Sequence, residues 1–209
     1  MLGPLRPLLG HEDGAVREHA LALVRNVAAF HGGVVAESVE GLLPALLGAA
    51  AREAAAAARR SDEGPAGGRG AAGADLRALA EEALQAVAAD ADPDRALAVV
   101  CAGLPGSHLE AVAAGAEELV ARIKCAGAVF RGMPPGAVLR WCPRVVGPLG
   151  LAMGHDAADV RKATVFAVLD MFASAGDAVL VHLAPHIADS HMRLVRLYID
   201  RMHGGGVAR

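Results

Sequence analysis

Histidines near the end of the sequence are the first residues whose spacing suggests metal chemistry. His182 and His186 are four residues apart, and Asp189 and His191 follow them closely. An unbroken helix would place this histidine pair on one face, as zinc sites need. Pro185 lies between the two histidines, however, and proline interrupts a helix because it lacks an amide hydrogen and crowds the preceding turn. We therefore predict structural or surface histidines here and no metal site.

Three cysteines are the next residues that could act chemically. Cys101, Cys125 and Cys142 form no Cys-x-x-Cys pair, and neither Cys125 nor Cys142 has a histidine or an acid beside it. Apolar neighbours predict buried thiols, and the odd count favours a reducing compartment over a disulfide framework. The Gly-rich stretch 59–73 lacks the Gly-Lys-Ser/Thr ending of a phosphate-binding loop. The sequence therefore predicts neither an enzyme nor a bound cofactor.

Composition predicts that helices position these side chains. Of the 209 residues, 54% are hydrophobic but only 3% are aromatic, with one Trp and one Tyr. Strands favour aromatic and β-branched residues, whereas the abundant Ala and Leu lose little side-chain entropy in a helix. We therefore expect an all-α protein. We expect no membrane span and no signal peptide, and the net charge of −3 argues against a nucleic-acid partner.

Internal repeats indicate how the helices are arranged. Residues 10–17, GHEDGAVR, resemble residues 154–161, GHDAADVR, and a third copy begins at Asp75. In each copy a helix follows with apolar residues at i, i+4, i+8 and i+11, which form one face. Apolar segments at 39–51 and 141–153, each containing a proline, precede two of these helices. This pattern predicts an α-solenoid of HEAT-like helical hairpins, an armadillo-type superhelix.

Capping residues and composition set the predicted boundaries. Asp13, Asp75 and Asp156 are predicted N-caps, because a carboxylate can accept hydrogen bonds from first-turn amides. Pro93 follows Asp92 as a first helical residue follows its cap. We expect HEAT-like helices at 1–58 with a truncated first repeat, a flexible low-complexity insertion at 59–73, further repeats at 74–203 and a flexible tail at 204–209. The predicted helices are 2–9, 15–30, 34–59, 74–89, 93–103, 107–130, 135–153, 157–174, 177–184 and 189–202.

The last third of the chain carries a more specific pattern. Residues 160–169 read VRKATVFAVL, GD and HL follow at 176–177 and 182–183, and residues 190–201 read SHMRLVRLYIDR. These motifs resemble the C-terminal helical domain of the CLASP family (cytoplasmic linker-associated proteins), in which a VRKA-VF helix precedes GD-L--HL and a closing S-MKLLNLYI-R helix. Here Arg193 and Val195-Arg196 stand in place of the family's Lys and Leu-Asn. The strong resemblance covers residues 143–202.

The resemblance implies a TOG-like helical domain without catalytic activity. CLASP proteins stabilise and organise microtubules, and their C-terminal domain recruits adaptor proteins at plus ends or kinetochores. Adaptors are therefore the implied partners, with tubulin as a further candidate, and the implied location is cytoplasmic, on microtubules or the spindle. Two alternatives stay open, namely a HEAT-repeat scaffold unrelated to microtubules and a HEAT-containing enzyme subunit.

Basic residues beside the repeat turns are candidate partner-binding side chains. Arg17, Arg161 and Lys162 lie one turn inside the repeat helices, and cations would complement the acidic surface of tubulin. The turns before them are acidic and contain no aromatic residue, which argues against direct capture of tubulin. In the alternative interpretation, these cations are solvated and pair with nearby carboxylates.

The closing helix provides a second candidate surface. Its predicted buried positions are Met192, Val195 and Ile199. Its predicted exposed positions are Arg193, Arg196, Asp200 and Arg201, several of them spaced for i, i+3 or i, i+4 contacts. These cations would bind an acidic partner segment. The alternative is the ordinary polar outer face that the end of any solenoid requires.

Overall fold

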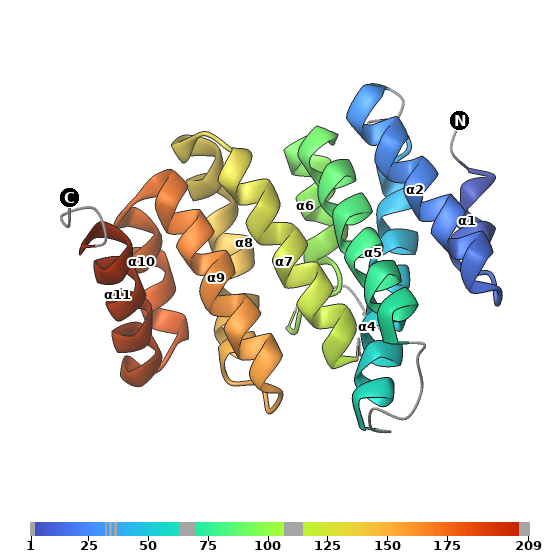
Figure 1. Cartoon of the computed structure of the whole chain (residues 1–209). Helices are drawn as coiled ribbons and strands as arrows, with labels where there is room; N and C mark the ends of the chain where they lie inside the picture. Colours follow the sequence, from blue (N-terminus) through green and yellow to red (C-terminus); the bar gives the residue numbers. More distant parts are fainter. Residues whose placement is uncertain are drawn as a thin grey trace.

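A computed structural model describes residues 3–31, 33, 35, 37–62, 70–106 and 115–204, and no strand occurs among them. The helices form an array of hairpins two layers deep (Figure 1). In one layer α2, α5, α7, α9 and α11 pack side by side in that order. Helices α1, α4, α6, α8 and α10 form the other layer. The fold is therefore all-α and solenoid-like, as the composition and repeats predict.

The observed helices follow the predicted ones closely along most of the chain. They are α1 (Leu5–Leu9), α2 (Gly14–Phe30), α4 (Val39–Asp62), α5 (Gly70–Asp90), α6 (Pro93–Cys101), α7 (Ala116–Gly132), α8 (Pro135–Met153), α9 (Ala158–Ala175), α10 (Ala178–Leu183), the short 3₁₀ helix η1 (Ala184–His186) and α11 (Asp189–Gly204). Of the helix predicted over 107–130, residues 107–114 lie outside the described residues.

The segment predicted as an insertion at 59–73 is helical at both ends. α4 continues to Asp62 and α5 already begins at Gly70, so only residues 63–69 lie outside the description. The five consecutive alanines at 54–58 favour continuation of α4 into this segment, because alanine has the highest helix propensity of any residue. The predicted tail likewise begins one residue later than expected, because α11 includes Gly204.

Two of the four predicted caps are confirmed and two are wrong. Asp13 accepts a hydrogen bond from the Ala15 amide at 2.8 Å, and Asp92 accepts one from the Arg95 amide at 2.9 Å. Asp75 lies inside α5, because that helix begins earlier than predicted. Asp156 does not cap α9, whose N-cap residue is Ala157.

The predicted apolar faces of the repeat helices form the core. Ala20, Ala80 and Ala163 are buried where their helices meet their neighbours. α7 and α9 approach each other closely, because a Cβ added to Gly127 would lie 2.7 Å from Asp170 Oδ2 and 3.2 Å from the Ala167 Cα. Small residues therefore set the distance between α7 and α9, which belong to the layer of helices that contains the candidate site described below.

Trp141 belongs to the core. Its ring is buried in α8, and its indole N–H donates to the Asp94 carboxylate of α6. The Arg144 guanidinium lies over the ring, 5.3 Å from its centroid. This tryptophan therefore links two hairpins.

Within the described residues, every helix is too short or too polar to cross a lipid bilayer.

Candidate functional site

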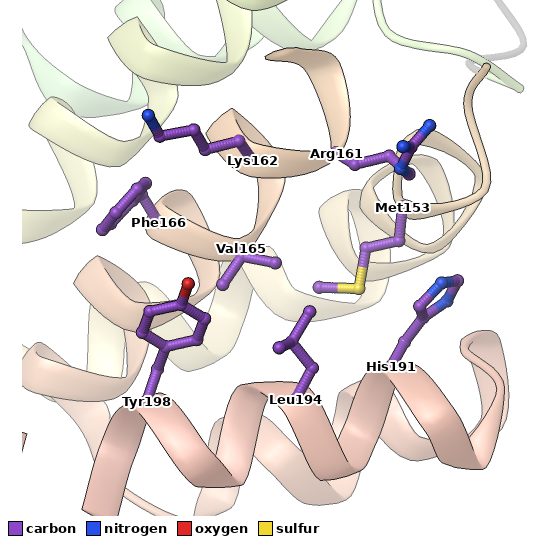
Figure 2. A pocket seen from close by; sticks show the side chains of 8 residues that line it. All are labelled: Met153, Arg161, Lys162, Val165, Phe166, His191, Leu194 and Tyr198. Atoms are coloured by element: carbon purple, nitrogen blue, oxygen red, sulfur yellow. The ribbon is translucent and has the colours of Figure 1, made fainter. Parts of the chain in front are cut away.

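A groove of about 250 Å³ separates α9 from α11 (Figure 2). We call it the α9–α11 groove. Most of its side chains come from these two helices, and one comes from the end of α8. Its lining residues are Met153, Arg161, Lys162, Val165, Phe166, His191, Leu194 and Tyr198.

The floor of the groove is apolar and partly open to solvent. Phe166 and Leu194 remain 49% and 40% exposed. The rings of Phe166 and Tyr198 face each other across the groove, tilted by 55° with centroids 6.2 Å apart. A groove of this kind offers apolar contact to another molecule, since water leaves such side chains at a gain in free energy.

The helical period explains why α11 lines the groove while also packing on the core. Val195 and Ile199 are buried, and they form one stripe of the helix. His191, Leu194 and Tyr198 follow a second stripe at i, i+3 and i+7, which turns toward the groove. α11 therefore has two apolar stripes, and only one of them is covered by the chain itself.

Cations surround this apolar floor, and no acid is among the eight lining residues. Arg161 and Lys162 come from the first turns of α9, on the side opposite α11 in Figure 2. Lys162 is exposed, and its side chain makes neither an ion pair nor a hydrogen bond with any residue that the structure describes. Arg201 of α11 lies close by, with its Cζ 5.8 Å from the centroid of the Tyr198 ring. The groove therefore presents positive charge without intramolecular neutralisation.

Arg161 also has a structural role. Its Nη1 donates to the carbonyl oxygens of His155 and Asp156, both at 2.7 Å. These two bonds hold the turn between α8 and α9. Of the two cations from α9, Lys162 is therefore the one fully available to a partner.

The structure separates the remaining predicted basic residues from this groove. Arg17 belongs to α2 at the other end of the array, where its Nε donates to the buried Glu53 at 2.7 Å. Arg17 thus pairs with a carboxylate, as the alternative interpretation predicts. Arg193 and Arg196 are exposed on α11, but neither lines the groove. Arg196 forms no ion pair with Asp200, although their i, i+4 spacing would allow one.

A larger hollow of about 570 Å³ lies over α4, α5, α7 and α9. We call it the central hollow. Its cations are mostly neutralised within the protein, since Arg77 lies 3.3 Å and Lys124 3.2 Å from Glu81. Arg131 binds Asp170 through two hydrogen bonds of 3.0 Å. The central hollow therefore differs in charge from the α9–α11 groove, although Lys162 and Phe166 line both.

The histidines and cysteines make no site of their own among the described residues. His182 lies in α10 and His186 in η1, because the helix ends before Pro185 as predicted. No group of three or more His, Cys, Asp or Glu in the described part of the chain is arranged to hold a metal. Burial raises the pKa of Cys101 and Cys125 to about 12. These thiols are therefore fully protonated near neutral pH, whereas a nucleophile must be a thiolate.

Sequence reasoning identified the cations of the groove but missed its apolar residues. Phe166, Leu194 and Tyr198 lie inside the motifs already noted, yet none was predicted as a contact residue. The signal for Leu194 and Tyr198 is the second stripe on α11, which a single amphipathic face does not explain. The sequence as a whole matches no model of a known protein family.

Proposed function

We propose that the chain is a non-catalytic interaction module of a CLASP-like, microtubule-associated protein in the cytoplasm. In this proposal the α9–α11 groove binds an acidic, amphipathic segment of an adaptor protein at microtubule plus ends or kinetochores. The two motifs that resemble the CLASP family, residues 160–169 and 190–201, supply the two long walls of the groove. The resemblance and the groove therefore concern the same residues.

The observation that carries the proposal is an unpaired Lys162 beside an exposed aromatic floor. A partner's carboxylate near Lys162 would gain charge complementarity. Its apolar side chains would cover Phe166, Leu194 and Tyr198, and large buried side chains of this kind usually contribute most of the binding energy. Neither the charge pairing nor the apolar contact needs a titratable catalytic group.

Adaptor binding is favoured over direct capture of tubulin. Arg17 and Arg161 each use Nη1 to hold the carbonyl oxygens of their own turn. These two arginines therefore have less capacity for an acidic external surface. The turns themselves remain acidic and without aromatic residues, as the sequence indicates.

The test measures binding of acidic segments from plus-end and kinetochore adaptors by fluorescence anisotropy. Lys162→Glu is expected to weaken binding about tenfold, which corresponds to about 1.4 kcal/mol. Arg140→Glu is the matched control, because Arg140 is exposed on α8 and lines neither hollow. Binding that is equally strong in wild type and Lys162→Glu would remove the groove from the proposal.

Microtubule cosedimentation distinguishes adaptor binding from direct binding of tubulin. The proposal expects little sedimentation of the isolated chain with microtubules and recovery when a bound adaptor is added. Strong sedimentation without an adaptor would favour direct tubulin binding. Absence of binding to every adaptor and to microtubules would favour a HEAT-repeat scaffold unrelated to microtubules.

A further inference from the structure

The α9–α11 groove and the central hollow meet on α9. Lys162 and Phe166 line both of them. The two residues are four positions apart in one helix, so their side chains lie on the same face. Figure 2 shows them at the end of the groove away from His191. A molecule that crosses α9 over these side chains therefore contacts the groove on one side and the central hollow on the other.

The floor of the central hollow is built from small side chains. Ala121, Ala128, Ala163 and Ala167 come from α7 and α9. Gly127 brings these two helices close together, as its short Cβ distances show. Small side chains at a contact permit closer approach between helices, within the usual interaxial range of roughly 8–10 Å. The floor therefore fits a helix lying across the layer.

Charge indicates what that helix must carry at the crossing. Arg77, Lys124 and Arg131 of the central hollow are all paired within the chain. Within the described part of the chain Glu117 and Asp159 have no side-chain partner, but each lies in the first turn of its own helix, where the helix dipole stabilises an acid. Lys162 has no carboxylate partner among the same residues, and it lies near the N-terminus of α9, where a cation gains nothing from the dipole. An external carboxylate would supply the missing partner.

The distance across the layer sets the length of the partner. From α5 to α11 there are three helix spacings, so the span is roughly 24–30 Å. A helix rises 1.5 Å per residue, and about 16–20 residues would cover that span. The α9–α11 groove alone would need only about a third of this length.

We infer that one acidic, amphipathic helix of about 16–20 residues lies across both hollows and crosses α9 with a carboxylate at Lys162. This inference rests on the proposed function, since it extends the same binding site toward α7 and α5. It assigns the central hollow to binding, which the groove alone does not require.

The test uses a displayed library of 20-residue helical peptides, with Asp, Glu, Leu and Phe varied on one face, selected against the full chain. The affinity of the best peptide is then measured for variants in each part of the proposed binding surface. Leu194→Ala tests the α9–α11 groove, and Lys162→Glu tests the point where the peptide crosses α9. Gln85→Glu tests the far side of the central hollow, where Gln85 is exposed on α5. Arg140→Glu is the control.

We expect each of the three variants to weaken binding at least fivefold and the control to leave it unchanged. Gln85→Lys is expected to strengthen binding, and this opposite sign cannot come from loss of fold. Peptides cut to either half should bind at least tenfold more weakly than the whole. Failure to select any binding peptide would overturn the inference.

One result would reject the inference and leave the proposed function intact. Loss of binding in Leu194→Ala and Lys162→Glu, with no effect of either Gln85 substitution, would confine the partner to the α9–α11 groove. Conversely, a selected peptide that behaves as expected while adaptor segments do not bind would reject the microtubule function and retain the extended site.

Discussion

Arg161 repeats in α9 the hydrogen bonds that Arg17 makes in α2. Nη1 of Arg17 donates to the carbonyl oxygens of His11 and the residue after it, both at 2.8 Å. Nη1 of Arg161 donates to the carbonyl oxygens of His155 and its successor, both at 2.7 Å. In both turns the histidine Nδ1 also accepts a backbone amide two residues ahead, at 3.1 Å and 3.0 Å. The sequence repeat is therefore a repeat of turn geometry.

The two arginines differ in one respect, and this difference predicts unequal effects on stability. Arg17 also pairs with Glu53, which is only 3% exposed, whereas Arg161 has no carboxylate partner among the residues that the structure describes. Arg17→Ala leaves a buried charge unpaired and is expected to lower the free energy of unfolding by about 3 kcal/mol. Arg161→Ala is expected to lower it by only about 1 kcal/mol, for two exposed hydrogen bonds. Urea unfolding monitored by circular dichroism measures both, and equal losses would contradict the assigned role of Glu53.

The close packing of α7 on α9 makes Gly127 sensitive to a single methyl group. In Gly127→Ala the new Cβ meets the Asp170 carboxylate and the backbone of α9, so the Asp170 side chain must turn away and α7 and α9 must shift slightly apart. We expect a loss of about 1–3 kcal/mol in the free energy of unfolding, typical of overpacking. Gly132→Ala in the same helix is the control, because its Cβ would meet no atom within 4 Å. That substitution should be neutral or stabilising, and thermal melts compare the two.

Helix positions could be predicted because local sequence determines them here. The apolar faces around Val24 and Val168 are buried as their spacing predicts. The wrong cap at Asp156 has an equally local cause, since the first copy has Asp13 where the second has Ala157. His155 accepts a hydrogen bond from the Ala157 amide at 3.0 Å, as His11 does in the first copy, but no side chain takes the place of the Asp13 cap.

The candidate site could be predicted only in part, because it depends on how two helices face each other. Lys162 was identified from its place after a turn, and it lies on the rim of the groove. Phe166 and Tyr198 are far apart in the sequence, and only the packing of α11 on α9 brings their rings to 6.2 Å. A hydrophobic pattern indicates which residues are buried. It does not indicate that Phe166 and Tyr198 stay partly exposed beside each other.

The buried thiols predict how stability changes with pH. Burial raises the pKa of Cys101 and Cys125 to about 12, from an ordinary value of 9.0. Above pH 9 the thiols ionise in the unfolded chain but not in the folded one, so rising pH favours unfolding. Between pH 8 and pH 10 each thiol should lower the free energy of unfolding by about 1.4 kcal/mol. The double variant Cys101→Ala, Cys125→Ala is the reference under reducing conditions, and parallel pH profiles for it and the wild type would contradict the prediction.

Phe166 should matter for binding and hardly at all for folding. Its ring is 49% exposed and its main aromatic contact is the tilted ring of Tyr198, so Phe166→Ala is expected to cost about 1 kcal/mol of stability or less. Phe130 is fully buried in α7, and Phe130→Ala is expected to cost about 3–5 kcal/mol. If Phe166 is an anchor for a partner, Phe166→Ala weakens adaptor binding at least tenfold while its urea midpoint stays near that of the wild type. A large stability loss in Phe166→Ala would instead make this ring part of the core, and the groove would lose its aromatic anchor.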